Sequence, residues 1–115
     1  YLSSRLENDA IDRQVKTGRA DKGDIRGVKT IRGTAVVIEC KSVSRDNLPL
    51  WIREAQIEAG NADTPIGVVC HKRWGSGKPE DQYVSMDLAT FALLLEGGPD
   101  DRPVIVIDPH TRGAA

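Results

Sequence analysis

Two acidic residues and a lysine are spaced so that they could share a metal ion. Glu39 and Lys41 close an apolar run over residues 35–38, and Asp24 lies fifteen positions before Glu39. Because side chains alternate between the two faces of a strand, Glu39 and Lys41 point to one face and Cys40 to the other. Two carboxylates brought together repel each other unless a cation lies between them, and Mg²⁺ binds through one or two carboxylates while keeping positions for water and phosphate. The residue types therefore predict a divalent-metal site.

A β-hairpin would bring these side chains together. Residues 24–28 and 34–41 are predicted as the two strands of one hairpin. If Val28 pairs near Ala35, the same register places the two carboxylates opposite each other. Directly opposed side chains in an antiparallel pair have Cβ atoms about 4.5–5.5 Å apart. The hairpin register is therefore what the metal site depends on.

The motif resembles the active site of the restriction-endonuclease-like nucleases, whose signature is an Asp, a variable gap, and then Asp/Glu-x-Lys. Segments 22–28, 37–41 and 51–55 are similar to those of the Holliday junction resolvases of actinobacterial phages, and the likeness covers residues 1–97. The resemblance implies an α/β fold with a restriction-endonuclease-like core, in which a central mixed β-sheet is flanked by helices.

The resemblance also implies residue roles in a Mg²⁺-dependent endonuclease, in which Mn²⁺ would substitute. Asp24, Glu39 and the backbone carbonyl of Cys40 are expected to hold the metal, which polarises the scissile phosphate and lowers the pKa of a bound water. Lys41 is expected to orient that water or to stabilise charge on the phosphate oxygens. Gln56, at the flank of the following helix, is either a polar helper of the site or an ordinary surface glutamine.

Basic residues supply candidate contacts to DNA. Lys72, Arg73 and Lys78 surround Trp74 in a predicted hairpin loop, a composition that suits phosphate contacts together with stacking on an exposed base. Trp74 is equally suited to covering the edge of the core. Arg26 is a further candidate. The family likeness implies branched DNA as the substrate and a homodimer as the active form, because a two-fold dimer presents two sites with the symmetry of a four-way junction.

Two other interpretations stay open. A repair or flap-type nuclease of the same superfamily would use the same chemistry on another DNA geometry. A non-catalytic nucleic-acid-binding module would keep the fold with a degenerate site. An acidic residue on an N-terminal helix, frequent in the family, is not visible here, and because the chain begins at Tyr1 without a methionine we expect an N-terminal segment to be missing.

Apolar periodicity and capping residues predict the remaining elements. Asp46 and Asn47 are candidate caps for the helix after the hairpin, on which Glu54 and Glu58 are expected to be solvated. A nuclease core is expected over residues 1–97, followed by an extension over 98–115. The predicted elements are a helix tail over 1–6, a loop over 7–23, a helix from 48 to about 60, strands over 65–71 and 82–86, a helix over 88–96 capped by Asp87, an edge strand over 103–108 and a mobile tail over 109–115.

Composition describes one globular domain and excludes several classes of protein. Of the 115 residues, 39% are hydrophobic and 29% are charged. No apolar run is long enough to span a membrane, and no organic cofactor is expected. Two cysteines cannot make a disulfide framework, and Cys40 and Cys70 each lie in an apolar run, where a free thiol is usually buried. We therefore expect an intracellular, cytoplasmic protein of a phage or its bacterial host.

The charge of the chain is small in total but uneven along the sequence. The net charge is −1, with +4 over residues 1–45 and −5 over residues 46–115. A protein that simply coats nucleic acid would be more basic than this. A local basic face remains compatible with these values, because phosphate contacts depend on where the charges gather rather than on their sum.

Overall fold

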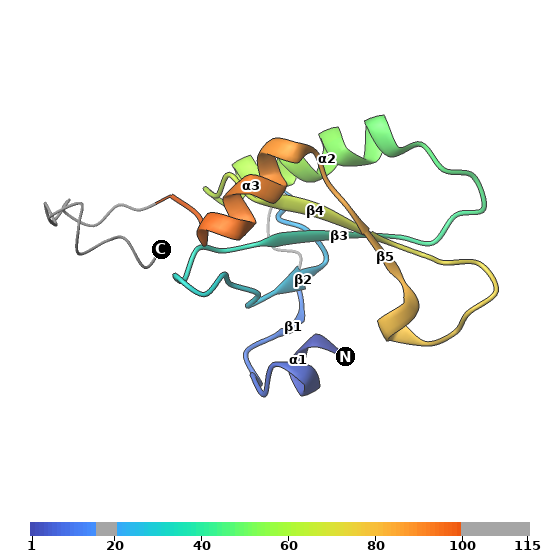
Figure 1. The fold of residues 1–115 in the computed structure, drawn as a ribbon, viewed down its shortest axis with the longest axis horizontal. Coiled ribbons are helices and arrows are strands. Elements are labelled where there is room, and N and C mark those ends of the chain that lie inside the picture. Colours follow the sequence, from blue (N-terminus) through green and yellow to red (C-terminus); the bar gives the residue numbers. More distant parts are fainter. Residues whose placement is uncertain (16–20, 100–115) are drawn as a thin grey trace, which may run out of the picture.

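The structure, a computed structural model, describes residues 1–15 and 21–99. Its centre is a five-stranded sheet in the order β1-β2-β3-β4-β5, with helices on both faces (Figure 1). Strands β3 and β4 are parallel, and the other neighbouring pairs are antiparallel. The predicted α/β class with a mixed sheet is confirmed. The elements in chain order are α1 (Leu2–Arg5), β1 (Asp12–Arg13), β2 (Ile25–Arg26), β3 (Val37–Lys41), α2 (Leu48–Asn61), β4 (Gly67–His71), the 3₁₀ helix η1 (Pro79–Asp81), β5 (Tyr83–Ser85) and α3 (Leu88–Glu96).

Helices α2 and α3 cover opposite faces of the sheet. Strand residues alternate between faces, so that Val69 faces α2, where it packs with Trp51 and Ala55. Val68 points the other way, into a second core cluster against which Leu93 of α3 packs. The sheet is therefore the shared wall of two small cores.

Capping residues fix where the two long helices begin. Asn47 accepts a hydrogen bond from the Leu50 backbone N–H at 3.4 Å, and Pro49 lies in the first turn, where a missing N–H costs little. Asp87 accepts a hydrogen bond from the Thr90 backbone N–H at 2.8 Å. Both helix starts agree with the sequence prediction.

Helix α2 lies very close to strand β4 because the first residue of the strand is glycine. A Cβ atom at Gly67 would lie 2.3 Å from the Ala55 carbonyl oxygen and 3.0 Å from the Ala59 Cβ atom. Glycine inside a strand often marks such a close approach of another backbone. Side chains on this face of α2 are consequently pressed against the sheet.

The hairpin of β2 and β3 has the expected register at its functional end. Ile25 pairs with Ile38, and the Asp24 backbone N–H donates to the Ile38 carbonyl oxygen at 2.8 Å. Extending the register by one residue sets Asp24 opposite Glu39. The register expected at this end of the hairpin is therefore present.

Near the turn the same hairpin departs from the predicted register. Ala35 pairs with Lys29 and not with Val28. Between the two pairings the β2 side carries one residue more than the β3 side, which is a β-bulge. Val28 does pair near Ala35, since the Val36 backbone N–H donates to the Val28 carbonyl oxygen at 2.9 Å, but an alternating pattern contains no signal for the inserted residue.

Two further expectations about the fold are wrong. The stretch 7–23 is not a loop throughout, because β1 lies within it and pairs with β2. Cys40 is exposed rather than buried, and Cys70, its partner in the parallel register, is half-buried. Cys70 lines a cavity of about 520 Å³ together with Ile38 and Val68, which leaves its side chain only half-buried.

Some expectations concern residues that the structure does not describe. The predicted edge strand over 103–108 and the tail over 109–115 lie outside residues 1–15 and 21–99. Helix α3 ends at Glu96, one residue before the expected end of the core. Within the described ranges, no helix has the length and apolar character that crossing a membrane requires.

Candidate metal and nucleic-acid site

Strand β3 ends on three residues with different surroundings. Glu39 has 9% of its surface exposed and lies on the face covered by α2, as does Val69, its partner in the register. Lys41 lies on the same face and is half-buried, whereas Cys40 points to the opposite face and is exposed. The alternation expected from the sequence is therefore present, with the acid buried and the lysine at its rim.

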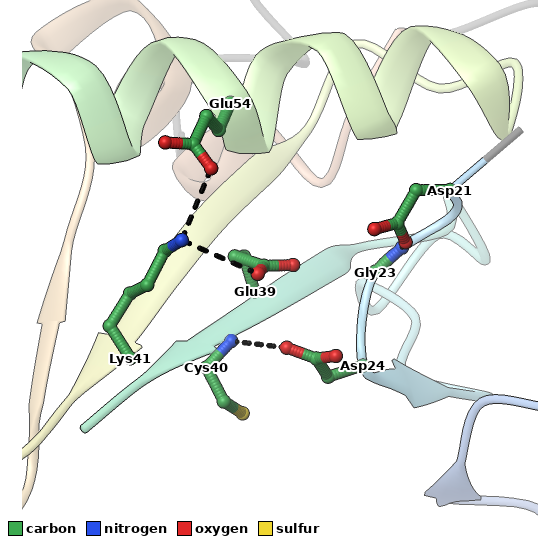
Figure 2. A network of polar contacts seen from close by, with 7 residues as sticks. All are labelled: Asp21, Gly23, Asp24, Glu39, Cys40, Lys41 and Glu54. Atoms are coloured by element: carbon green, nitrogen blue, oxygen red, sulfur yellow. Dashed lines mark hydrogen bonds and ion pairs between the residues drawn. The ribbon is translucent and has the colours of Figure 1, made fainter. Parts of the chain in front are cut away.

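Asp24 lies beside Cys40 at the start of β2 (Figure 2). Its carboxylate Oδ2 accepts a hydrogen bond from the Cys40 backbone N–H at 2.8 Å. The N–H and C=O groups of one strand residue point toward the same neighbouring strand, so the Cys40 carbonyl faces this edge as well. The structure thus brings the side chain of Asp24 and the backbone of Cys40 together next to Glu39.

Lys41 is held by two carboxylates. Its Nζ atom lies 3.1 Å from Glu54 Oε2 and 3.8 Å from Glu39 Oε1 (Figure 2). Partial burial lowers the pKa of Lys41, but the hydrogen bond and charge of Glu54, with a smaller effect of Glu39, outweigh this and keep it above its ordinary value. The ammonium group is therefore charged at neutral pH. Glu54, expected to be solvated, has a side chain 37% exposed and positions the lysine.

Glu58 is buried beneath α2, which corrects the expectation that it is solvated. Only 7% of its surface is exposed, because the contact of α2 with Gly67 presses this face of the helix against the sheet. Burial, followed by the hydrogen bond with Glu39 and the charge of Glu39, raises the pKa of Glu58 to about 9. At neutral pH Glu58 is therefore an uncharged acid that can donate a hydrogen bond to its neighbour.

Glu39 is the centre of the acidic groups. Burial has the largest effect and raises the pKa of Glu39, and the charges of Asp24 and, less strongly, Asp21 raise it further. The hydrogen bond with Glu58 and the charge of Lys41 lower the pKa. The net pKa of Glu39 lies above its ordinary value. A group under these opposing influences changes its protonation readily when a cation arrives.

Asp21 is the third carboxylate near Glu39. Its Oδ1 atom accepts a hydrogen bond from the Gly23 backbone N–H at 3.0 Å, and its carbonyl oxygen accepts one from Asn61 Nδ2 at 2.8 Å. Gly23 has φ of +90°, and a Cβ atom there would lie 2.7 Å from Val37 Cγ1. This turn therefore needs glycine, and it holds Asp21 between β3 and the end of α2.

Sequence reasoning missed Asp21 and Glu58. A signal for Glu58 was present, because it lies between Ala55 and Ala59 on the buried stripe of α2. An acid inside an apolar stripe indicates a buried carboxylate that needs a partner. Asp21 had a weaker signal, its place two residues before a glycine that a turn requires.

Gln56, the predicted helper, contacts a different part of the molecule. Its side chain is exposed, and its Nε2 atom donates to Asp87 Oδ2 at 2.6 Å. Asp87 is the N-cap of α3. Gln56 thus connects α2 to the start of α3, and no described contact joins it to Asp24, Glu39 or Lys41.

The basic loop, residues 72–78, follows β4 at the edge of the sheet where β3 also ends. The Lys72 backbone N–H donates to the Lys41 carbonyl oxygen at 3.1 Å, so the loop begins beside the site. Lys72 Nζ donates to the Ser76 carbonyl oxygen at 2.7 Å, which uses this lysine to hold the loop together. Trp74 is 56% exposed, so that it does not cover the core. Lys78 is exposed as well.

The other two predicted DNA contacts have protein partners. Arg73 lies over the ring of Tyr83, with 6.0 Å between its Cζ atom and the ring centroid. Arg26 Nη2 lies 3.8 Å from Asp12 Oδ2, and both side chains are more than half exposed. Exposed ion pairs of this kind are weak and exchange readily with a phosphate. Arg26 lies on β2, on the other side of β3 from the basic loop.

Comparison of the chain with models of known protein families, with curated proteins and with solved structures finds no match. The function of the chain is therefore inferred from its own residues. They provide a buried group of carboxylates, a charged lysine and an adjacent basic loop at one edge of a mixed sheet.

Proposed function

We propose that this chain is a metal-dependent endonuclease that hydrolyses phosphodiester bonds in DNA, with four-way junctions as its substrate. The observation that carries the proposal is the convergence of Asp24, Glu39 and Lys41 at the end of β3, at the sheet edge where the basic loop begins. Carboxylates beside a fixed ammonium group are the side chains that metal-assisted phosphodiester hydrolysis needs.

The donors near Asp24 fit a hard divalent cation. Glu39 presents its Oε1 atom at the rim of the site, 3.8 Å from Lys41 Nζ. Asp24 uses one carboxylate oxygen for the Cys40 N–H and retains a second. Together with the Cys40 carbonyl these are oxygen ligands, which Mg²⁺ and Mn²⁺ prefer. A bound ion supplies a polarised phosphate and a water of lowered pKa.

Lys41 presents a fixed positive charge to a phosphate at this site. Its contacts with Glu54 and Glu39 hold the ammonium group at the rim of the buried carboxylates. A charge positioned before the reaction stabilises the negative charge that develops on phosphate oxygens, without reorganisation at the moment of reaction. We assign to Lys41 the stabilisation of that charge and the orientation of the attacking water.

The basic loop supports DNA as the substrate. Lys78 and Trp74 are exposed on the loop that begins beside the site, and an ammonium group can contact phosphate while an indole ring can stack on an unpaired base. Unpaired or splayed bases occur where DNA branches. Two nicks at a four-way junction require two sites, so we propose a two-fold dimer.

The proposal is tested by incubating the purified protein with labelled four-way junction, with Mg²⁺ and with EDTA. Cleavage in Mg²⁺ and none in EDTA is expected. Flap, nicked and linear duplexes compete in the same assay, and preferred cutting of flaps would identify a repair-type nuclease instead. Binding without cutting in either Mg²⁺ or Mn²⁺ would contradict the enzymatic assignment and leave a nucleic-acid-binding module.

The dimer is tested separately from the chemistry. Equilibrium sedimentation of the protein at micromolar concentration, with and without junction DNA, is expected to show a dimer at least in the presence of DNA. A monomer under both conditions would contradict paired nicking, because one chain carries one such site.

A further inference from the structure

Three carboxylates from distant parts of the chain meet beneath helix α2. Asp21, Glu39 and Glu58 each place an oxygen within 4.8 Å of the others. Glu39 comes from β3, Glu58 from α2 and Asp21 from the turn before β2. Asp24 is not a member of this group, so the cluster is a different arrangement from the one that the Asp…Glu-x-Lys motif predicts.

Two buried oxygens in the cluster have no partner outside it. Glu58 and Glu39 share one hydrogen bond through the Glu58 proton, and no other described group donates to Glu58 Oε2 or Glu39 Oε2. Glu58 as a whole is only 7% exposed. Buried polar atoms are almost always partnered in native proteins, so a buried pair of acids that share one proton and have no other partner points to a group that binds there. One shared proton can bridge two oxygens, but it does not compensate the negative charge that Asp21 adds.

We infer that Asp21, Glu39 and Glu58 form a second divalent-cation site, which shares Glu39 with the site at Asp24. All donors are carboxylate oxygens, which favours hard cations such as Mg²⁺, Mn²⁺ or Ca²⁺ over Zn²⁺. Glu39 and Glu58 form the buried floor of this site, and the exposed Asp21 is its opening to solvent.

A role of this second cation in catalysis rests on the proposed function, whereas the existence of the site is argued from the three side chains alone. Glu39 Oε1 faces Lys41, and Glu39 Oε2 is the buried atom of the cluster. A cation on the Oε2 side fixes the orientation of Glu39.

The test counts cations bound by the full chain, using Mn²⁺ with EPR detection of the free ion and no DNA present. About two Mn²⁺ are expected per wild-type chain, and about one in Glu58→Gln and in Asp21→Asn. Asp21 is exposed, and asparagine keeps the oxygen that accepts from the Gly23 N–H, so this second variant retains its fold. Glu80→Gln, which removes an exposed carboxylate on η1, is the matched control and should bind as wild type does.

The outcomes separate this inference from the proposed function. Binding of about one Mn²⁺ that is lost in Asp24→Asn and unchanged in Glu58→Gln and Asp21→Asn would overturn the second site and leave the proposed metal ligands intact. Loss of a site in Glu58→Gln and Asp21→Asn, with Asp24→Asn unaffected, would support the second site and contradict the ligand set of the proposed function. Wild-type protein that binds no Mn²⁺ at millimolar concentration would overturn both.

Discussion

Replacing Glu58 by glutamine is expected to stabilise the metal-free protein at pH 8 and to remove much of the pH dependence of its stability. In the folded chain, burial and the neighbouring Glu39 raise the pKa of Glu58 to about 9. In the unfolded chain a glutamate has a pKa of about 4.3. Between these two values the folded chain holds a proton that the unfolded chain has released. The free energy of unfolding therefore falls as the pH rises through this window.

The size of the effect follows from proton linkage. A proton bound only by the folded state lowers the free energy of unfolding by about 1.4 kcal/mol for each pH unit. Between pH 6 and pH 8, which both lie inside the window, the wild-type protein should lose about 2.7 kcal/mol through Glu58. Glutamine has nearly the same shape and carries N–H donors at all pH values, so it can keep the hydrogen bond to Glu39 without the titration.

Urea denaturation followed by far-UV circular dichroism, in EDTA at pH 6, 7 and 8, measures this effect. The difference between the wild-type and Glu58→Gln slopes gives the effect of residue 58 together with its hydrogen-bonded neighbour Glu39. Glu54→Gln is the control, because Glu54 lies on the same helix with a partly exposed side chain. Equal slopes in the wild type and Glu58→Gln would refute a buried, protonated Glu58.

Three further predictions concern the site, the helix contact and the basic loop. Asp24→Asn should lower junction cleavage by several orders of magnitude, while junction affinity in EDTA changes little. Lys41→Met should abolish cutting yet retain Mn²⁺ binding. If both variants cut as the wild type does, the assignment of the site is contradicted. Gly67→Ala should lower the free energy of unfolding, measured by urea denaturation, by about 1–3 kcal/mol because α2 must move. Gly60→Ala, in open space on α2, should leave it unchanged or raise it by up to about 1 kcal/mol. Equal effects of the two substitutions would contradict the close packing at Gly67. Alanine at the three basic positions of loop 72–78 should weaken the salt dependence of DNA binding. The slope of the logarithm of the binding constant against the logarithm of salt concentration should fall by about 0.9 for each phosphate that is no longer neutralised. An unchanged slope would exclude the loop from the DNA-binding face.

Local signals in the sequence were sufficient for much of the fold. Asn47 and Asp87 cap helices where the apolar periodicity begins, and the alternation along β3 separates Glu39 from Cys40. These features depend on a few consecutive residues, so they can be predicted from the chain alone. The register at Ile25 and Ile38, which opposes Asp24 to Glu39, also agrees with the prediction made from pairing near the turn of the hairpin.

The rest of the candidate site depends on contacts between distant residues. Glu58 lies within an apolar stripe, but its residue type suggested solvent, and its burial is decided by how closely α2 approaches the sheet. That distance is set by Gly67, which belongs to another element. Asp21 reaches the cluster only because its turn is tied to Asn61 at the far end of α2. No spacing rule within either segment contains this information.

The close contact at Gly67 also has a consequence for how the molecule can adapt to a ligand. Because no side chain separates the β4 backbone at Gly67 from Ala55 of α2, side-chain rotation cannot let the helix slide or tilt at this point. We therefore expect α2 and the parallel strands to move together, so that Glu39 on β3 and Glu58 on α2 keep their spacing when a ligand binds. Adjustment to different DNA shapes is left to the exposed segments 42–47 and 72–78 at the ends of those strands. Substitutions there should change which DNA is selected, and substitutions along the contact should change whether the chemistry works at all.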